Sequence, residues 1–277
     1  MNRMKARLKK MILHLILLIG VFISIFPFYW LVVMASNKTG DILAFPPKLT
    51  LGNELFANIG KVLLNVDFFQ AFLNTLFVAC ASTAGILFFC SLAGFTFAKF
   101  VFPGKRILFG GLLVTMMIPS QLSFIPSFLM VAEIGWASTF KALIIPGIAS
   151  AFGIFWIKQF AEEAIHDSLL DAGRLDGCSP FSLYWHIALP ILRPALAFLG
   201  IFSFIGSWND YLWPLVALND PEKFTLQVAL SQLNGIYTTD YGMVMAGTLM
   251  ATLPLIIFFL FVSRQFISGI TAGALKD

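Results

Sequence analysis

The chain has 277 residues, of which 59% are hydrophobic and only 12% are charged. A soluble domain carries about 25% charged residues, so a soluble fold of this length could not cover so much apolar surface, and lipid must cover part of it. The net charge of +4 does not indicate nucleic-acid binding, because the basic residues lie mostly at the ends of apolar runs, as in membrane proteins.

Six apolar runs are candidates for transmembrane helices, because a bilayer core about 30 Å thick needs about 20 helical residues. In chain order they are Met11–Met34, Ala71–Ala98, Ile107–Ala132, Ala142–Ile157, Pro194–Leu218 and Tyr241–Ser263. The fourth run is long enough only if it extends into its polar flanks. The sequence therefore predicts an all-α integral membrane protein with six transmembrane helices, in one domain over residues 1–277.

The first run follows a basic segment, Met1–Lys10, and could belong to a cleaved signal peptide. The apolar region of a signal peptide spans about 7–15 residues, whereas Met11–Met34 contains 24, so we predict an uncleaved first helix. If six helices alternate from an inner N-terminus, the inner segments hold 13 of the 18 basic residues and the outer segments hold 5. This bias predicts that both termini are cytoplasmic.

Prolines interrupt every run except the second, and the pair in the third run is the most informative. Pro119 and Pro126 each remove a backbone donor and can break the helix. Ser120, Gln121 and Ser123 would then lie beside broken backbone at membrane depth. Two interpretations stay open. Neighbouring helices and hydroxyl groups could compensate the defect, or the polar residues could line a translocation path, with Gln121 as its candidate residue.

The polar segment 161–190, between the fourth and fifth runs, is predicted to be a cytoplasmic loop of two short helices. Ser168 followed by Asp171 resembles a capping box and predicts the start of the first helix. Gly177 suits a helix C-terminus, where a positive φ is often needed. Ser179-Pro180 predicts an N-cap followed by proline at the first helical position.

Small and charged residues make the turn of this loop a candidate docking surface. The small residues are Ala172, Gly173 and Gly177, and the charged residues around them are Asp171, Arg174 and Asp176. A groove of another protein could approach such a backbone closely. The alternative is an amphipathic hairpin that lies on the inner leaflet.

Asp210 is the only charged residue inside the fifth run. An Asp at the bilayer centre costs about 2.5–3.5 kcal/mol, but Asp210 lies about 26 Å from the inner end of the predicted helix at 1.5 Å per residue, near the outer interface. It is either an interfacial residue that pairs locally, with Trp208, Tyr211 and Trp213 as an aromatic belt, or part of a polar outer gate together with Asn209.

No motif of a catalytic or nucleotide-binding site occurs in the sequence, which contains neither GxxxxGK[ST] nor GxGxxG and neither GxSxG nor HExxH. The three cysteines lack CxxC spacing and the three histidines are scattered, so a metal site has no support. We therefore predict that the chain is not an enzyme, binds no metal and does not hydrolyse ATP. Energy for uphill transport would arrive through a partner.

The loop resembles that of ABC importer permeases, whose pattern is E-A-A, then G, then I-x-L-P. Here the pattern reads Asp171-Ala172-Gly173, then Gly177, then Ile187-Ala188-Leu189-Pro190. Leu175-Asp176-Gly177 followed by Leu189-Pro190 is similar to the carbohydrate-uptake branch, of the maltose or multiple-sugar type. Further similarities are Phe45-Pro46-Pro47, Asn74-Thr75, Met117-Ile118-Pro119, Trp208-Asn209-Asp210 and the tail Ser268–Lys276. Three positions differ from the family: Asp171 replaces glutamate, Gly173 replaces alanine, and His166 replaces proline.

This resemblance implies a permease subunit of an ATP-driven sugar importer, with an oligosaccharide as the expected solute, in the plasma membrane of a prokaryote. The implied partners are a second permease subunit in a heterodimer, two ATP-binding subunits and an extracytoplasmic sugar-binding protein. The chain itself would bind no cofactor, since its partners use the ATP. Residues 171–177, Leu189 and Pro190 would couple the chain to the ATPase, and the tail Gly269–Lys276 would reach the ATPase pair. The alternative is a secondary, ion-coupled solute carrier.

Overall fold

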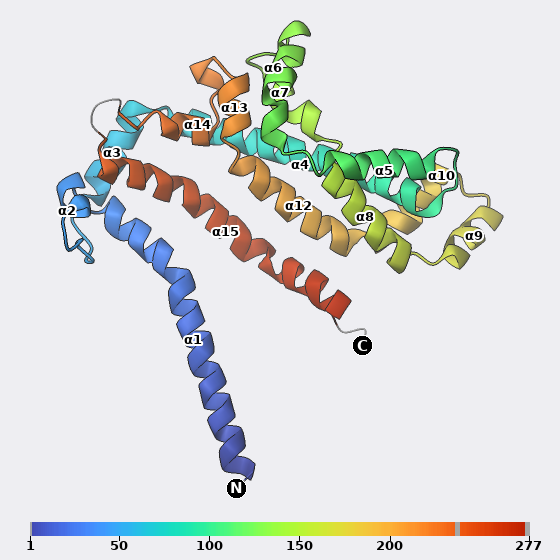
Figure 1. The fold of residues 1–277 in the computed structure, drawn as a ribbon, viewed down its shortest axis with the longest axis horizontal. Helices are drawn as coiled ribbons and strands as arrows, with labels where there is room; N and C mark the ends of the chain where they lie inside the picture. The colour runs from blue at the N-terminus through green and yellow to red at the C-terminus, as the bar shows by residue number, and fades with distance from the viewer. Residues whose placement is uncertain (1, 236–238, 275–277) are drawn as a thin grey trace. The chain divides into compact units, whose positions relative to one another are not determined.

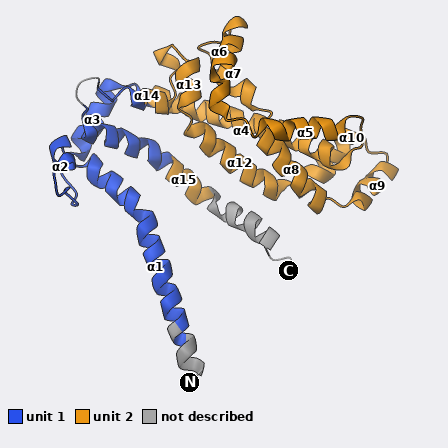
Figure 2. Cartoon of the chain, in the orientation of Figure 1, with its two compact units in different colours: residues 1–68, 230–254 blue, residues 69–229, 255–277 orange. Residues whose placement is uncertain are grey.

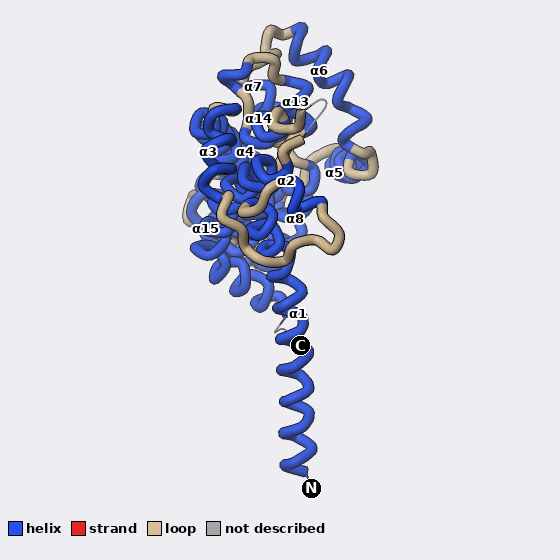
Figure 3. Tube along the Cα trace, turned by 90° about the vertical axis from the view of Figure 1, so that its left-hand side faces the viewer, coloured by secondary structure: helices blue, strands red, loops and turns tan. Residues whose placement is uncertain are grey.

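The computed structural model describes the backbone of residues 2–235 and 239–274, and the side chains of Arg7 and of residues 9–235 and 239–261. Within these ranges every regular element is a helix (Figure 1, Figure 3), which confirms the all-α prediction. The chain forms two compact units, residues 1–68 with 230–254 and residues 69–229 with 255–277 (Figure 2). The tail Gly269–Lys276 lies outside the described side chains, and its last two residues lie outside the described backbone.

Four helical stretches are long and apolar enough to cross a membrane. Two bent helix pairs, Lys105–Thr115 with Ser120–Glu133 and Pro180–Ile191 with Arg193–Trp208, bring the number to six if each pair is one span. The four are Lys9–Ala35 in α1 (Asn2–Ala35), α4 (Phe68–Lys99), Phe140–Ala164, and Tyr241–Phe261 in α15 (Tyr241–Ala274). They correspond to the first, second, fourth and sixth predicted runs. The fourth consists of α7 (Phe140–Ile144), η2 (Ile145–Gly147) and α8 (Ala151–Ala164), and it extends into the polar flank as its short apolar run required.

The third predicted run is two helices rather than one. α5 (Lys105–Thr115) ends before Pro119, and η1 (Ser120–Ser123) continues into α6 (Phe124–Glu133) at an angle of 97° to α5. The predicted break in the backbone is thus confirmed. Pro126 lies in the first turn of α6, where its missing N–H leaves no carbonyl unpaired.

The fifth predicted run also breaks, so Pro194–Leu218 is not one continuous helix. α12 (Arg193–Trp208) ends at Trp208, and α13 (Leu212–Ala217) follows after a short gap. Pro214 explains the break. In a continuous helix its ring would clash with the carbonyl of Asp210, and proline has no N–H to donate to that carbonyl. In α13 the same proline lies in the first turn, where it is tolerated.

In unit 1, a buried asparagine side chain caps the C-terminal end of α1. The segment after α1, predicted only as a long loop, contains α2 (Thr39–Leu43) and α3 (Leu55–Asn65). Asn58 on α3 is 1% exposed, and its Nδ2 donates to the carbonyl oxygens of Ala35 at 2.9 Å and Asn37 at 3.2 Å. These carbonyls lie at and beyond the C-terminus of α1, where helices leave carbonyls unpaired.

In unit 2, α4, α8 and α12 pack into a common core on which the loop rests. A Cβ on Gly94 of α4 would lie 2.7 Å from Cβ of Ile157 on α8, so the absent side chain allows the two helices to approach closely. Trp156 Nε1 on α8 donates to the carbonyl oxygen of Ala195 on α12 at 3.1 Å. The remaining helices between α12 and α15 are η4 (Pro221–Lys223) and α14 (Leu226–Ser231).

We predict that Asn58→Ala destabilises the protein by about 1–3 kcal/mol, because it leaves two buried carbonyls without a donor. The measurement is thermal unfolding of the purified protein in detergent. Asn65→Ala on the same helix is the control, since Asn65 is exposed and its loss should change stability by less than about 0.5 kcal/mol. Equal melting temperatures for the two variants would contradict the role of Asn58.

Candidate functional site

The polar segment 161–190 folds into two helical parts joined by a tight turn, as predicted. Its first four residues belong to the end of α8. The first part is α9 (Asp167–Leu175), which stands apart from the long helices in Figure 1. The second part, Pro180–Ile191, consists of α10 (Pro180–Ser182), the π-helix η3 (Leu183–Ala188) and α11 (Leu189–Ile191).

The start of α9 differs from the prediction. The helix begins at Asp167 with His166 as its N-cap, so Ser168 lies inside the first turn and the predicted capping box is wrong. Asp167 instead accepts a hydrogen bond from Lys99 Nζ at the end of α4, at 2.9 Å. This hydrogen bond, together with the positive charge of Lys99, lowers the pKa of Asp167. A negative charge in the first turn also interacts favourably with the helix dipole.

The end of α9 and the start of α10 confirm the predictions. Gly177 has φ +81°, its N–H donates to the Arg174 carbonyl at 3.1 Å, and the Cys178 N–H donates to the Gly173 carbonyl at 2.9 Å. This pair of bonds is a Schellman motif. The Ser179 side chain then accepts from the Ser182 N–H at 3.2 Å, with Pro180 at the first helical position.

Gly173 is buried, so its predicted place on an exposed small-residue surface is wrong. A Cβ at this position would lie 2.6 Å from Cδ2 of Leu183 and 2.9 Å from Cδ1 of Ile187. The glycine therefore allows α9 to pack directly on η3. Sequence pattern alone did not reveal this contact, because nothing in the local spacing says which face of a nine-residue helix meets its neighbour.

The exposed residues at the C-terminal end of α9, which we call the α9 face, carry charge and one large apolar side chain. It consists of Asp171, Ala172, Arg174, Leu175 and Asp176. Arg174 Nη1 and Asp171 Oδ1 form an ion pair at 2.7 Å, while Leu175 is 89% exposed. The turn that the sequence singles out as a docking surface thus exposes an ion pair and an apolar side chain together, although a single exposed leucine is by itself ordinary on a protein surface.

The second part of the loop is fixed to α4. Tyr184 is 1% exposed, and its hydroxyl shares a hydrogen bond with Ser91 Oγ at 2.7 Å. Its ring lies 6.0 Å from that of Phe95. Leu189 packs against the same core, and Pro190 follows it just before α12 begins. The segment Pro180–Ile191 meets α12 at 79°, so the chain bends sharply just after Pro190, where the fifth apolar run begins.

The candidate residues of the translocation path lie at the two helix breaks. Gln121 is exposed in η1. Asn209 Nδ2 donates to the Ile205 carbonyl at 3.0 Å and so closes the end of α12. Asp210 Oδ1 accepts from the Trp213 N–H at 3.4 Å, which supports the interpretation that it pairs locally.

Packing joins the two breaks. The rings of Phe124 and Trp213 lie 6.0 Å apart, so the start of α6 contacts α13, and Figure 1 shows α6, α7 and α13 together. Trp213 Nε1 also donates to the Ala142 carbonyl at 3.0 Å. Trp208, in contrast, is 1% exposed and packs edge-to-face on Phe72, so the interpretation that placed it in an aromatic belt does not hold for Trp208.

Two further residues of the site were not predicted. Lys99 and Ser91 on α4 hold the two halves of the loop through Asp167 and Tyr184. The only sequence signal was the position of Lys99 at the end of an apolar run. Neither spacing nor composition connects these residues, which are 68 and 93 positions apart from their partners.

The chain is similar to known transport proteins over its whole length. Residues 90–266 match the model of a family described as "Binding-protein-dependent transport system inner membrane component". The chain is 35% identical over 276 residues to the lactose transport system permease protein LacG of Rhizobium radiobacter, covering 100% of both. It is 33% identical over 260 residues to the arabinooligosaccharides transport system permease protein AraQ of Bacillus subtilis (strain 168), covering 91% of this chain and 90% of AraQ.

A solved structure shows the same fold. It is the crystal structure of a bacterial ABC transporter involved in the import of the acidic polysaccharide alginate, and one of its chains matches with a TM-score of 0.80 at 23% identity. The match covers 94% of this chain and 97% of that chain. At this level of identity the likeness supports the fold alone.

We predict that Gly173→Leu lowers the melting temperature in detergent, with a loss of about 1–3 kcal/mol from overpacking between α9 and η3. Gly173→Ala should cost less, because the atoms it meets are the ends of flexible Leu and Ile side chains. Ala172→Leu is the matched control, since Ala172 is exposed on the same helix. If Gly173→Leu were no less stable than Ala172→Leu, the close packing would be refuted.

The ion pair between Lys99 and Asp167 predicts a pH-dependent stability. The pKa of Asp167 is lowered in the folded state. The ion pair therefore contributes to folding stability above the pKa of an Asp side chain in the unfolded chain, about 3.9, and this contribution is lost as pH falls through the folded pKa. The difference in melting temperature between wild type and Asp167→Asn should therefore be largest near neutral pH and vanish in acid. A difference that does not change with pH would argue against this ion pair.

Proposed function

The chain belongs to the family of binding-protein-dependent transport system inner membrane components, and on this premise we propose that it forms one half of the translocation pathway for an oligosaccharide. It is a permease subunit of an ATP-driven importer, not an ion-coupled carrier, and it is a multi-pass protein of a prokaryotic plasma membrane. The observation that carries the carbohydrate assignment is the similarity to permeases named for lactose and arabinooligosaccharides.

A permease of this family works together with a second permease, an ATPase and a solute-binding protein. We propose that the second permease is a different chain, that two ATP-binding subunits complete the complex, and that the binding protein is extracytoplasmic and binds sugar. ATP is then bound by these subunits, while this chain binds no cofactor or nucleic acid and catalyses no reaction. The relatives support this division of labour, since they are named as transport permeases and not as enzymes.

The proposed coupling surface is the α9 face, which we expect to dock in a groove of an ATP-binding subunit on the cytoplasmic side. Asp171, Arg174 and Asp176 would supply charge, and Leu175 an apolar anchor. The two termini would lie on the same side of the membrane, as the distribution of basic residues predicts. The tail Gly269–Lys276 is proposed to reach the same subunits.

The contacts of the loop suggest how movement would be transmitted. α9 is packed on η3 through Gly173, η3 is bonded to α4 through Tyr184, and Leu189 and Pro190 lead directly into α12. A displacement of α9 would therefore move the loop as a body and act on α4 and α12 together. Such coupling works by rigid-body shifts between states that bind the solute differently.

We place the translocation path near the two helix breaks. Gln121, Asn209 and Asp210 lie on segments that meet through the contact between Phe124 and Trp213. Broken helices are tolerated at membrane depth where they line a cavity or are covered by protein. This supports a path or gate in which these polar groups face the partner permease.

The proposed function is tested with the complex reconstituted in vesicles together with its binding protein. Sugar-loaded binding protein should stimulate ATP hydrolysis several-fold, and uptake should require ATP inside the vesicle and persist when ionophores collapse ion gradients. Parallel assays with a disaccharide, an arabinooligosaccharide and an amino acid define the solute class. Stimulation by the amino acid alone would overturn the carbohydrate assignment.

We predict that Gly177→Trp uncouples ATP hydrolysis from transport. The space around Gly177 is open, but its φ of +81° is unfavourable for a residue with a side chain, so the turn between α9 and α10 must change. Uptake should fall at least about tenfold, the effect of about 1.4 kcal/mol on a barrier, while the complex still inserts and hydrolyses ATP. Gly135→Trp is the matched control, since Gly135 has φ +72° and open space in a different turn. Uptake at the control's level in Gly177→Trp would refute the coupling role.

A further inference from the structure

The second half of the loop carries an exposed aromatic surface that the α9 face does not include. Phe181 and Trp185 are 55% and 49% exposed, and their rings stack at 6.2 Å. They lie on the segment Pro180–Ile191, which meets α12 at 79°. If α12 runs across the membrane, a segment at this angle to it lies near the membrane plane, where Trp and other aromatic rings favour the level of the lipid head groups.

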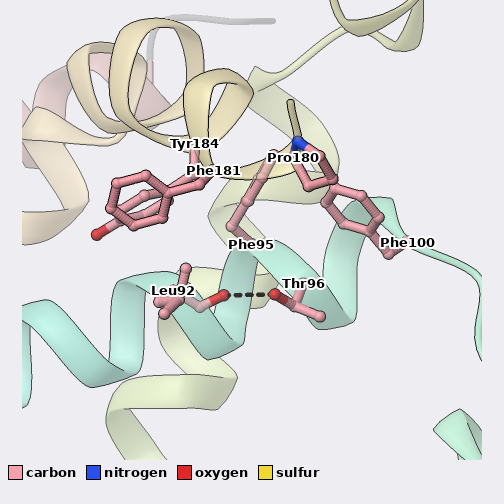
Figure 4. Close-up of a pocket in the computed structure, with 7 residues that line it drawn as sticks. All are labelled: Leu92, Phe95, Thr96, Phe100, Pro180, Phe181 and Tyr184. Atoms are coloured by element: carbon pink, nitrogen blue, oxygen red, sulfur yellow. Dashed lines mark hydrogen bonds between the residues drawn. The ribbon is translucent and has the colours of Figure 1, made fainter. Parts of the chain in front are cut away.

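An apolar pocket of about 340 Å³ lies between this segment and the end of α4 (Figure 4). Its lining residues are Leu92, Phe95, Thr96 and Phe100 on one side and Pro180, Phe181 and Tyr184 on the other. The volume falls within the range of about 300–1,000 Å³ that is typical of small-molecule sites. The pocket thus opens where two helical segments meet at the predicted inner surface of the membrane.

The chemistry of the lining suits a hydrocarbon chain. Thr96 Oγ1 already donates to the Leu92 carbonyl at 2.8 Å, and the Tyr184 hydroxyl is bonded to Ser91 Oγ at 2.7 Å. The two hydroxyls of the lining therefore have partners within the protein. A sugar in this pocket would lose its hydrogen bonds to water without replacement, which is costly, whereas an acyl chain would lose none.

A positive charge lies beside the pocket. Lys105 Nζ donates to the carbonyl oxygen of Phe100, a lining residue, at 3.0 Å. Lys99, by contrast, is engaged by Asp167. Among the described residues, no carboxylate lies within ion-pair distance of Lys105, so its charge is available to an anion. Basic residues at this depth attract the phosphates of anionic lipids.

We infer that this pocket holds an acyl chain of an anionic phospholipid from the inner leaflet, with the phosphate of its head group next to Lys105. The lipid would contact α4 and the segment Pro180–Ile191 at the same time. It would therefore stabilise the packing of the coupling loop on the membrane helices. This inference rests on the membrane location of the chain and is independent of which solute is carried.

The test measures the lipids retained by the intact importer complex. The complex is exchanged into nanodiscs with equal amounts of phosphatidylglycerol and phosphatidylcholine, released into mild detergent and analysed by native mass spectrometry. Wild type should retain a phosphatidylglycerol for each copy of this chain. Leu92→Trp, which fills the pocket, should lose it, and Lys105→Ala should lower the preference for phosphatidylglycerol by about fivefold, the effect of one basic residue near an anionic surface.

Matched variants separate these effects from general damage. Phe88→Trp adds a similar side chain at an exposed site of α4, and Lys141→Ala removes an exposed cation on α7. Both should retain lipid as wild type does. If Leu92→Trp does not assemble, Thr96→Phe fills the same pocket. Lipid retention equal to wild type in an assembled filling variant would overturn the inference. So would a wild-type complex that retains no phosphatidylglycerol. In that case, a label on a Phe181→Cys variant that is protected only when the ATP-binding subunit is present would show that a protein covers the pocket.

Discussion

The hydrogen bond between the Tyr184 hydroxyl and Ser91 Oγ, at 2.7 Å in a buried site, holds the segment Pro180–Ile191 on α4. A buried hydroxyl is costly unless it is bonded, so this pair determines where η3 can lie on α4. Once η3 is in place, Gly173 determines how closely α9 approaches it, and the ion pair between Lys99 and Asp167 holds the start of α9. The position of the α9 face therefore depends on contacts made by α4.

The loop has two surfaces with different chemistry. α9 exposes charged residues and Leu175, which suits a protein groove that can supply both charge and apolar contact. The segment Pro180–Ile191 exposes stacked aromatic rings at a steep angle to α12, which suits the boundary between lipid and water. The sequence left two alternatives open for this loop, docking to a partner and lying on the inner leaflet. We propose one for each half of the loop, docking for α9 and contact with the leaflet for Pro180–Ile191.

Prolines shape the rest of unit 2 by ending helices rather than bending them. Pro119 separates α5 from η1, and Pro214 prevents α12 from continuing into α13. Each break exposes backbone and polar side chains within an apolar chain, which membrane proteins tolerate only where protein covers them or a cavity is lined. The contact between Phe124 and Trp213 brings the two breaks together, so a translocation path could be built from irregular segments on a rigid frame of long helices.

Local patterns were enough to predict the apolar runs, the break at Pro119, the glycine turn at Gly177 and the N-cap at Ser179, because hydrophobic length, missing donors and turn geometry act over a few neighbouring residues. They were not enough to predict that Gly173 is buried, that α9 starts with an ion pair instead of a capping box, or that Trp208 lies in the core. Each of these depends on which residue of a distant helix lies opposite. That choice is made when the helices pack, since burial and pairing over many tens of residues leave no trace in local spacing.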